Sequence, residues 1–499
     1  MSGPGVVNIR IDGRDLQVAA GTTVLKAAGA IGIEIPRFCY HPAFEPEGSC
    51  RMCLVEIEGL PKLDLACSTI VREGMKVQTS TPRVLEARKD VLEFLLADHP
   101  LDCPICDKAG ECFLQEYYDR HGRFASRFIE PKEKKRKKIP LGKNLLLDRE
   151  RCVLCTRCVR FLRKVTGTGE LGVFERGVRA EVGIDTGGEI RNNYSGNLVD
   201  ICPVGAITDT DFRFKTRAWF LDKGRTVCAR CSRGCNMVVH SVRGYPLRGG
   251  QRRVYRVVPA ENPAVNGHWI CDFGRYGCHE LDDNRRLAVG VNRGGPGEAK
   301  APEWDRVLKG VAAEIRALAS GGRAARLAVI LSSFLTNEEL AACRQLFVES
   351  LGAGHVFFAD PKPGQADGYL LTADRAPNGR GAESLGFART LPDLNLLAKS
   401  SDLLLIFGPH LLEHFGADAT AAALGGIGRK YLFAAHQSPL DAVADIVLPT
   451  ALPAEKRGSF TNVDGITQSF EPAVRAPKGC RAESEVLARL AEELGVELG

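Results

Sequence analysis

The segment HPLDCPICDKAGEC, from His99 to Cys112, spaces one histidine and three cysteines as H-x3-C-x2-C-x5-C. It follows an amphipathic stretch, 82–97, which is predicted to be a helix. A lone histidine near cysteines is usually a surface or core residue. Here the three cysteines have no fourth cysteine nearby in the sequence. A cluster iron would therefore need one more donor, which an imidazole can supply. The predicted ligands of this iron–sulfur cluster are His99, Cys103, Cys106 and Cys112.

A second run of cysteines, Cys152 to Cys158, has the C-x2-C-x2-C spacing of half of a bacterial two-cluster ferredoxin. The next cysteine of such a run normally serves the other cluster, but Leu162 stands at its expected place. Counting back from Cys202-Pro203, the other half-site would need cysteines where the chain has Asn192, Ser195 and Leu198. One cluster of the pair has therefore lost its ligands. The remaining 4Fe–4S cluster is predicted to be held by Cys152, Cys155, Cys158 and Cys202.

The first 80 residues carry another set, spaced C-x10-C-x2-C-x13-C. Val6–Ile11 is predicted to be a strand, Thr22 is expected to cap the helix Thr23–Ala30, and Leu54–Ile57 is predicted to be a later strand. Strand, turn, helix and then a long cysteine loop is the order of a plant-type ferredoxin, which holds a 2Fe–2S cluster. Zinc is the alternative, since four thiolates also form a zinc site. The close pair in C-x2-C is expected to share one iron. The predicted ligands are Cys39, Cys50, Cys53 and Cys67.

A fourth set begins with C-x2-C-x3-C and is completed by a distant cysteine shortly before Gly274-Arg275. This pattern resembles the N-terminal cluster domain of molybdopterin oxidoreductases and predicts a further 4Fe–4S cluster. Cys278 is the alternative to Cys271 as the last ligand, and zinc or an empty site is the alternative to a cluster. The predicted ligands are Cys228, Cys231, Cys235 and Cys271.

From about residue 300 the pattern changes to strands that alternate with helices, which predicts a small α/β layer with a mostly parallel sheet. Leu327–Ser332 is predicted to be a buried strand, and Thr336 to cap a helix over 337–351. The segment from Ala444 to Gly465 resembles the one that closes the central domain of molybdopterin enzymes. About 220 residues cannot include the full set of pterin-binding domains, and no Cys-His-Arg run occurs here. We therefore expect no molybdopterin.

Composition argues against a nucleic-acid-binding, membrane-spanning or secreted protein and for one that binds metal. The chain has 499 residues, a net charge of +6 and 18 cysteines, of which all but three lie between Cys39 and Cys271. The small net charge gives no case for nucleic-acid binding. No apolar stretch is long enough to span a membrane, and the N-terminus has no signal-peptide pattern. Clustered cysteines in such a chain are metal ligands by default. The basic run 132–138 is interpreted as a solvated linker or, alternatively, as a surface for an acidic partner.

The His99–Cys112 segment closely resembles the cluster segment with one His and three Cys ligands in the large iron–sulfur (G-type) subunit of respiratory NADH:quinone oxidoreductase, complex I. The resemblance implies an electron-transfer subunit of a translocase, with no bond-making chemistry of its own. It implies electron transfer from a flavin-bearing NADH-oxidising subunit toward quinone, with the fourth cluster off the main path. Further implied partners are a thioredoxin-like 2Fe–2S subunit and the iron–sulfur subunits of the quinone arm. The implied location is the cytoplasmic side of the bacterial inner membrane, peripheral through the complex.

Related NAD-linked hydrogenases and formate dehydrogenases carry the same segment, so an electron-transfer subunit of one of these is the alternative. A zinc-stapled scaffold without a redox role is a further alternative. The predicted fold is multidomain, α+β and α/β. Its domains are a β-grasp 2Fe–2S ferredoxin domain (1–80), a His-ligated 4Fe–4S domain (81–140), a bacterial-ferredoxin-like 4Fe–4S domain (141–218), a molybdopterin-oxidoreductase-type 4Fe–4S domain (219–290) and a truncated molybdopterin-oxidoreductase-like α/β domain (291–499).

Overall fold

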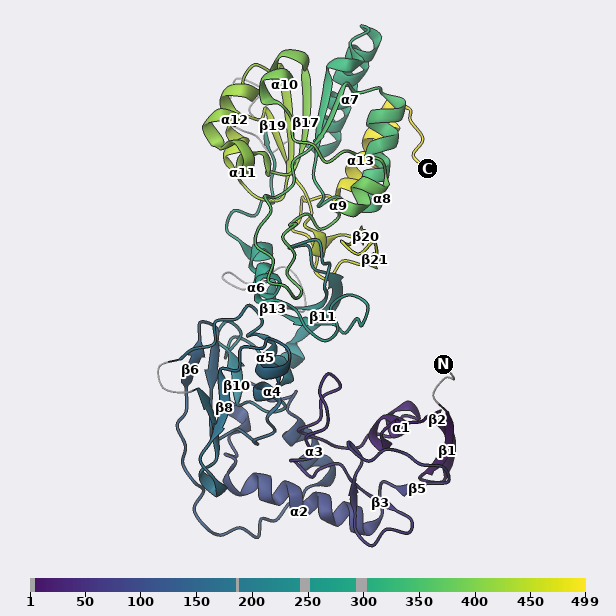
Figure 1. The fold of residues 1–499 in the computed structure, drawn as a ribbon. Helices are drawn as coiled ribbons and strands as arrows, with labels where there is room; N and C mark the ends of the chain where they lie inside the picture. The colour runs from purple at the N-terminus through teal and green to yellow at the C-terminus, as the bar shows by residue number, and fades with distance from the viewer. Residues whose placement is uncertain (1–4, 185–187, 243–251, 293–302) are drawn as a thin grey trace. The chain divides into compact units, whose positions relative to one another are not determined.

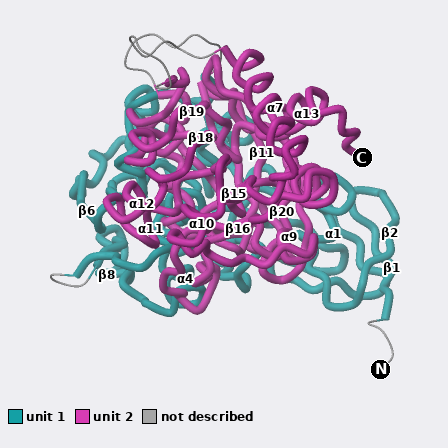
Figure 2. The backbone as a smooth tube through the Cα atoms, turned by 90° about the horizontal axis from the view of Figure 1, so that it is seen from above, with its two compact units in different colours: residues 1–220 teal, residues 221–499 magenta. Residues whose placement is uncertain are grey.

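The computed structural model describes residues 5–184, 188–242, 252–292 and 303–499. The chain divides into two compact units, Met1–Phe220 and Leu221–Gly499 (Figure 2). No helix in the described part of the chain is long and apolar enough to cross a membrane.

A mixed five-stranded sheet, in the order β2-β1-β5-β3-β4, forms the beginning of the first unit. Its elements are β1 (Val6–Ile11), β2 (Arg14–Ala19), α1 (Val24–Ala30), β3 (Leu54–Ile57), β4 (Asp64–Leu65) and β5 (Lys76–Gln78). Strands β1 and β5 run parallel, and the other pairs are antiparallel. The predicted cap at Thr22 is wrong by one residue, because the Thr23 side chain accepts the hydrogen bond from the Lys26 backbone N–H.

The rest of the first unit is organised around one long helix and two small sheets. Helix α2 (Pro82–Asp98) is capped at its N-terminus by Thr81, whose hydroxyl accepts from the Val84 backbone N–H. His99 directly follows its last residue. The other elements are α3 (Phe113–His121), β6 (Ile139–Gly142), β7 (Leu145–Leu147), α4 (Arg157–Lys164), β8 (Leu171–Phe174), β9 (Glu181–Ile184), α5 (Asn197–Ile201) and β10 (Ile207–Asp209).

The basic run after α3 is tied to its surroundings at several points. The Lys132 ammonium donates to the backbone carbonyl of Ala97 (2.9 Å), and Lys135 donates to that of Ala180 (2.7 Å). Lys137 pairs with Glu150 at 2.7 Å. These lysines therefore fasten the linker to the segments on either side of it.

The second unit begins with an antiparallel three-stranded sheet and ends in an α/β layer. The first part contains β11 (Leu221–Val227), β12 (Asn236–Val242), β13 (Val254–Pro259) and α6 (Asp272–Tyr276), and it is joined by β20 (Gly458–Thr461) and β21 (Thr467–Phe470). The α/β layer contains β14 (Val291–Asn292), α7 (Trp304–Ser320), β15 (Leu327–Leu331), α8 (Asn337–Cys343), β16 (His355–Phe358), α9 (Gly379–Ser384), α10 (Leu394–Ser400), β17 (Leu403–Phe407), α11 (Leu411–Phe415), α12 (Ala417–Leu424), β18 (Arg429–Ala434), β19 (Ile446–Pro449) and α13 (Glu483–Leu494).

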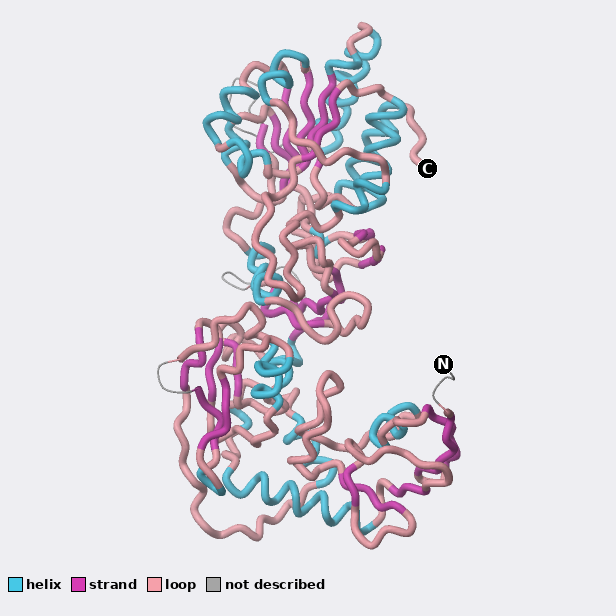
Figure 3. The backbone as a smooth tube through the Cα atoms, in the orientation of Figure 1, coloured by secondary structure: helices cyan, strands magenta, loops and turns pink. Residues whose placement is uncertain are grey.

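The α/β layer has the mostly parallel sheet that the sequence predicts, in the order β14-β19-β18-β17-β15-β16 with only β14 antiparallel. Helices α7, α8 and α13 cover one face, and α10, α11 and α12 cover the other (Figures 1 and 3). Alternate residues of each strand enter the two cores, because side chains along a strand point to opposite faces. Both faces of the sheet are thus buried.

Three charged side chains are buried together beside this layer. The Lys456 ammonium, 1% exposed, lies 2.6 Å from Glu339 and 2.7 Å from Glu483. Glu339 also belongs to the capping box with Thr336 that starts α8, so the predicted cap at Thr336 is confirmed. Burial raises the pKa of Glu339, whereas the Lys456 charge acts to lower it. The triad joins α8, α13 and the segment before β20.

Lys456→Met should lower the free energy of opening of the α/β layer by about 3–5 kcal/mol, because it leaves two buried carboxyl groups without their cation. Hydrogen exchange at the amides of β15 and β17 measures this change. The control is Arg457→Met, since that side chain is exposed and its ion pair with Glu471 is worth little. Equal protection of these amides from hydrogen exchange in the two variants would contradict the stabilising role assigned to Lys456.

Candidate iron–sulfur sites

The first set of cysteines lies against the five-stranded sheet. Cys39, Cys53 and Cys67 are buried, and Cys50 is half-buried. A hydrogen bond from the Cys50 thiol lowers the pKa of Cys39. The Cys53 thiol likewise lowers the pKa of Cys67. The four thiols thus contact one another in two pairs, Cys39 with Cys50 and Cys53 with Cys67.

This pairing differs from the one expected from the spacing, in which Cys50 and Cys53 share an iron. Arg51, between them, has a φ of 57°, in the left-handed region. The chain thus turns within C-x2-C, and the two side chains meet different partners. The thiol contacts differ from that expectation, and the assignment of cysteines to each iron stays a prediction.

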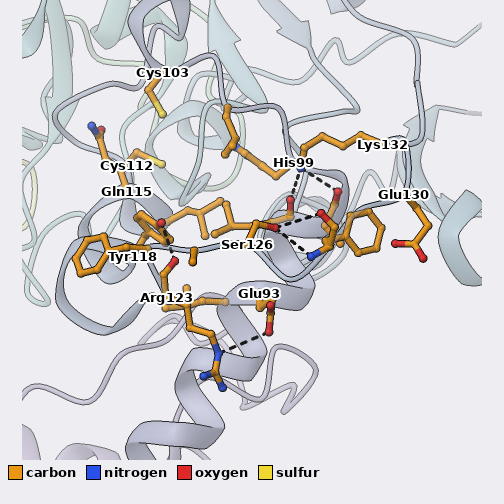
Figure 4. Close-up of a pocket in the computed structure, with 18 residues that line it drawn as sticks. Glu93, His99, Cys103, Cys112, Gln115, Tyr118, Arg123, Ser126, Glu130 and Lys132 are labelled. Carbon is orange, nitrogen blue, oxygen red and sulfur yellow. Dashed lines mark hydrogen bonds and ion pairs between the residues drawn. The ribbon is translucent and has the colours of Figure 1, made fainter.

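Three of the four predicted ligands of the second set line a cavity of about 340 Å³ at the end of α2, whereas Cys106 is buried and is not part of its lining. His99, Cys103 and Cys112 line it together with apolar side chains, as Figure 4 shows. Burial lowers the pKa of His99 to about 4, so the imidazole is neutral at pH 7, as a metal ligand must be. Its Nδ1 atom is buried and has no hydrogen-bond partner among the described residues. A buried, unpaired nitrogen is costly unless something else contacts it, and a metal would do so.

The third set lies around the start of α4. All four predicted ligands line one small cavity of about 20 Å³. Burial raises the pKa of Cys152 to about 12 and that of Cys155 to about 11, and neighbouring thiols add to both increases. The backbone N–H groups of Leu154 and Arg157 point at these two sulfurs and act to lower the pKa of each thiol. Leu154 has a φ of 48°, which helps to turn its N–H inward.

The fourth set lies in the second unit, where all four predicted ligands are buried. Burial raises the pKa of Cys235, and Cys228, Cys231 and Cys271 add to the effect, so the four thiols are neighbours. A Cβ atom at Gly274 would lie 3.1 Å from the Cys228 sulfur and 3.5 Å from the Cys271 sulfur. The fold thus places Cys271 beside Cys228, which supports it over the alternative, Cys278.

The segments that carry the second and third sets contact each other. A Cβ atom at Gly205 would lie only 2.3 Å from the Cys106 sulfur, so any other residue there would displace that sulfur. The backbone N–H of Phe113 donates to the Pro203 carbonyl at 2.9 Å, which joins the residues that follow Cys112 and Cys202.

Sequence reasoning missed the charged residues that hold these loops. Arg151, next to Cys152, donates two hydrogen bonds, of 2.6 and 3.2 Å, to the carboxylate of Asp102, next to Cys103. Arg157 and Arg160 of α4 are also buried. Their positions beside cysteines were the only signal in the sequence, and it does not reveal partners that lie far away along the chain.

These features fit iron–sulfur clusters. The donors are thiols and one neutral imidazole, and most are buried. In the third and fourth sets, neighbouring thiols raise the pKa of Cys158 and Cys235, an effect that a bound cation would offset. Within the described ranges, no three His, Cys, Asp or Glu side chains lie close enough to hold a single metal ion. The fit rests on the donor sets and the cavities beside them.

Four family models match the chain. They are a 2Fe-2S iron-sulfur cluster binding domain (5–82), the NADH-ubiquinone oxidoreductase-G iron-sulfur binding region (88–127), the ferredoxin-like domain of NADH-quinone oxidoreductase subunit 3 (142–208) and molybdopterin oxidoreductase (433–493). They confirm the predicted fold class, a multidomain α/β chain with ferredoxin-like domains and a partial molybdopterin module.

The G-type subunit of NADH-quinone oxidoreductase from Streptomyces coelicolor is 38% identical over 387 residues, which are 77% of this chain and 44% of that protein. The chain is thus similar to G-type subunits over most of its own length. The 75 kDa NADH-ubiquinone oxidoreductase subunit of Reclinomonas americana is 35% identical over 81% of this chain and 56% of its own length. The chain spans about half the length of the curated relatives it matches. A crystal structure of an NAD+-reducing [NiFe]-hydrogenase contains a chain 31% identical to this one, with coverage of 42% of this chain and 91% of that chain and a TM-score of 0.39.

His99→Ala should abolish the low-temperature EPR signal of the second cluster and leave the 2Fe–2S signal intact, because only the second cluster loses a donor. His99→Cys should restore a cluster of lower reduction potential, since an anionic thiolate replaces a neutral imidazole. The control is His121→Ala, which changes a histidine of the following helix α3. An unchanged second signal in His99→Ala would show that His99 is merely nearby.

Proposed function

We propose that this chain is the electron-transfer subunit of an NADH:quinone oxidoreductase, a translocase, and performs no bond-making chemistry of its own. Its cofactors are one 2Fe–2S and three 4Fe–4S clusters, held by the four donor sets described above. When bound, such clusters accept and release single electrons without a change of ligands. The chain's part is to hold the sites close together, bury them and set their potentials.

The observation that carries this proposal is the contact between the segments that carry the donor sets in the first unit. The third set contacts the second through Gly205 and Cys106, and it contacts the first through hydrogen bonds from α4 to the backbone carbonyls of Cys39 and Tyr40. The first and second sets contact each other less directly, through the Phe38 and Tyr117 rings, whose centroids are 5.3 Å apart. These contacts support electron transfer from the first site to the third and then to the second.

The same proposal names the partners. A flavin-bearing NADH-oxidising subunit supplies electrons, a thioredoxin-like 2Fe–2S subunit accompanies it, and iron–sulfur subunits of the quinone arm receive the electrons. The chain is then peripheral, on the cytoplasmic side of the bacterial inner membrane. The names of the relatives support this assignment, since they are subunits of NADH-quinone and NADH-ubiquinone oxidoreductases.

For the α/β layer we propose a structural role without a pterin. The molybdopterin family model matches only 433–493, and Asp272 and Phe273 stand where a lysine often bridges cluster and pterin in true molybdoenzymes. The layer is nonetheless well packed on both faces of its sheet, so it can serve as a docking surface for neighbouring subunits. Stoichiometric molybdenum or tungsten in the purified protein would overturn this role.

Purification through a tag on this chain should bring down membrane subunits and an NADH-oxidising subunit, whereas a hydrogenase partner would contradict the assignment.

In that complex, Cys155→Ser should remove the third cluster. NADH should then still reduce the first cluster, while freeze-quench EPR shows reduction of the second slowed by orders of magnitude. The matched control is Cys278→Ser, which lies outside the four sets. Reduction of the second cluster at the wild-type rate in Cys155→Ser would refute the proposed order of electron transfer.

A further inference from the structure

We propose that Arg157 and Arg160 form a positioning pair that fixes the first donor set against the third and raises the reduction potential at both sites. The inference rests on the proposed function, because it requires that both sets hold clusters. Both arginines lie on the first turn of α4, on either side of Cys158, and both are within the first compact unit. They are 5% and 7% exposed, whereas Arg163 on the same helix is exposed.

Arg160 joins the two sites through one guanidinium group. Its Nη2 atom donates to the backbone carbonyl of Cys39, a predicted ligand of the first cluster, and to that of Cys155, a predicted ligand of the third, at 3.3 Å. The Nη1 atom donates to the Glu45 carbonyl at 3.2 Å, and the guanidinium carbon lies 5.2 Å from the centroid of the Phe44 ring. The side chain therefore fixes the loop that follows Cys39 at several points.

Arg157 makes the same connection one helical turn away. It donates to the carbonyl of Tyr40 at 2.5 Å and to the carbonyl of Ile201 at 3.1 Å. Tyr40 follows Cys39, and Ile201 precedes Cys202. Its guanidinium carbon also lies 5.6 Å from the centroid of the Phe113 ring, next to Cys112. One side chain thus contacts a neighbour of a predicted ligand in each of the first three sets.

The charges of these two groups need a partner. In the described part of the chain Arg157 forms no ion pair, and Arg160 has only Glu47, at 3.7 Å, whose side chain is 42% exposed. Two guanidinium ions buried among carbonyl groups are costly unless negative charge lies nearby. The thiolates of the first and third sets supply that charge.

The expected electrostatic effect follows from this arrangement. An electron that arrives at either site adds one negative charge, forms no bond and takes up no proton at these arginines. A fixed positive charge nearby stabilises the reduced state, and the stabilisation is large because the groups are buried. Removal of either charge should therefore make both sites harder to reduce. The second effect is geometric, since the shared hydrogen bonds set the spacing of the two sites.

The test uses the full chain with its clusters, titrated potentiometrically and followed by EPR. Arg160→Gln and Arg157→Gln should each shift the midpoint potentials of the first and third clusters to more negative values. Arg163→Gln is the matched control on the same helix and should shift neither potential.

Lysine variants separate charge from position. Arg160→Lys keeps the charge, so the potentials should stay near those of the wild type. It loses the planar fork that holds the Cys39 and Cys155 carbonyls through Nη2 and the Glu45 carbonyl through Nη1. The magnetic interaction between the first and third clusters, measured by spin-relaxation enhancement, should weaken. Gln variants with unchanged potentials and unchanged magnetic interaction would overturn the proposal. If the Gln variants do not assemble both clusters, unchanged magnetic interaction in Arg160→Lys overturns it. Absence of both signals from the wild-type chain would instead refute the proposed function.

Discussion

Burial of several thiols in one place is the constraint on which the rest of this structure depends. Grouped, desolvated cysteines raise the pKa of their neighbours, as Cys152 and Cys155 do for Cys158, so they resist becoming thiolates unless positive charge is supplied. Bound iron is one source of that charge, and buried arginines are a second. The loops that carry the cysteines have little regular structure, and these arginines also provide much of their support.

This constraint accounts for the organisation of the first unit. Around the third set, Arg151 reaches the loop of the second set, while Arg157 and Arg160 reach the loop of the first. Helix α4 therefore does more than supply Cys158, because its first turn connects three cysteine-bearing segments. In the second unit the α/β layer is stabilised differently, by two apolar cores and the buried Lys456 triad.

The sequence predicted features that depend on local spacing. The cap at Thr336, the helix before His99 and the parallel sheet all follow from short patterns, and the structure contains them. Long-range contacts were not predictable. Arg157 and Tyr40 are 117 positions apart, and the pairing of Cys50 with Cys39 depends on how a loop turns at Arg51. The ligand assignments themselves stay predictions, since spacing names candidate donors but does not show the metal.

The central claim is that four donor sets in one chain hold four clusters of two types. Mössbauer spectroscopy of the full chain, loaded with iron-57 and reduced, tests it most directly. The account predicts about 14 irons per chain, about 2 with a 2Fe–2S spectrum and about 12 with 4Fe–4S spectra, one of these altered by an imidazole ligand. Tightly bound zinc without acid-labile sulfide, or iron present only as single ions, would contradict it.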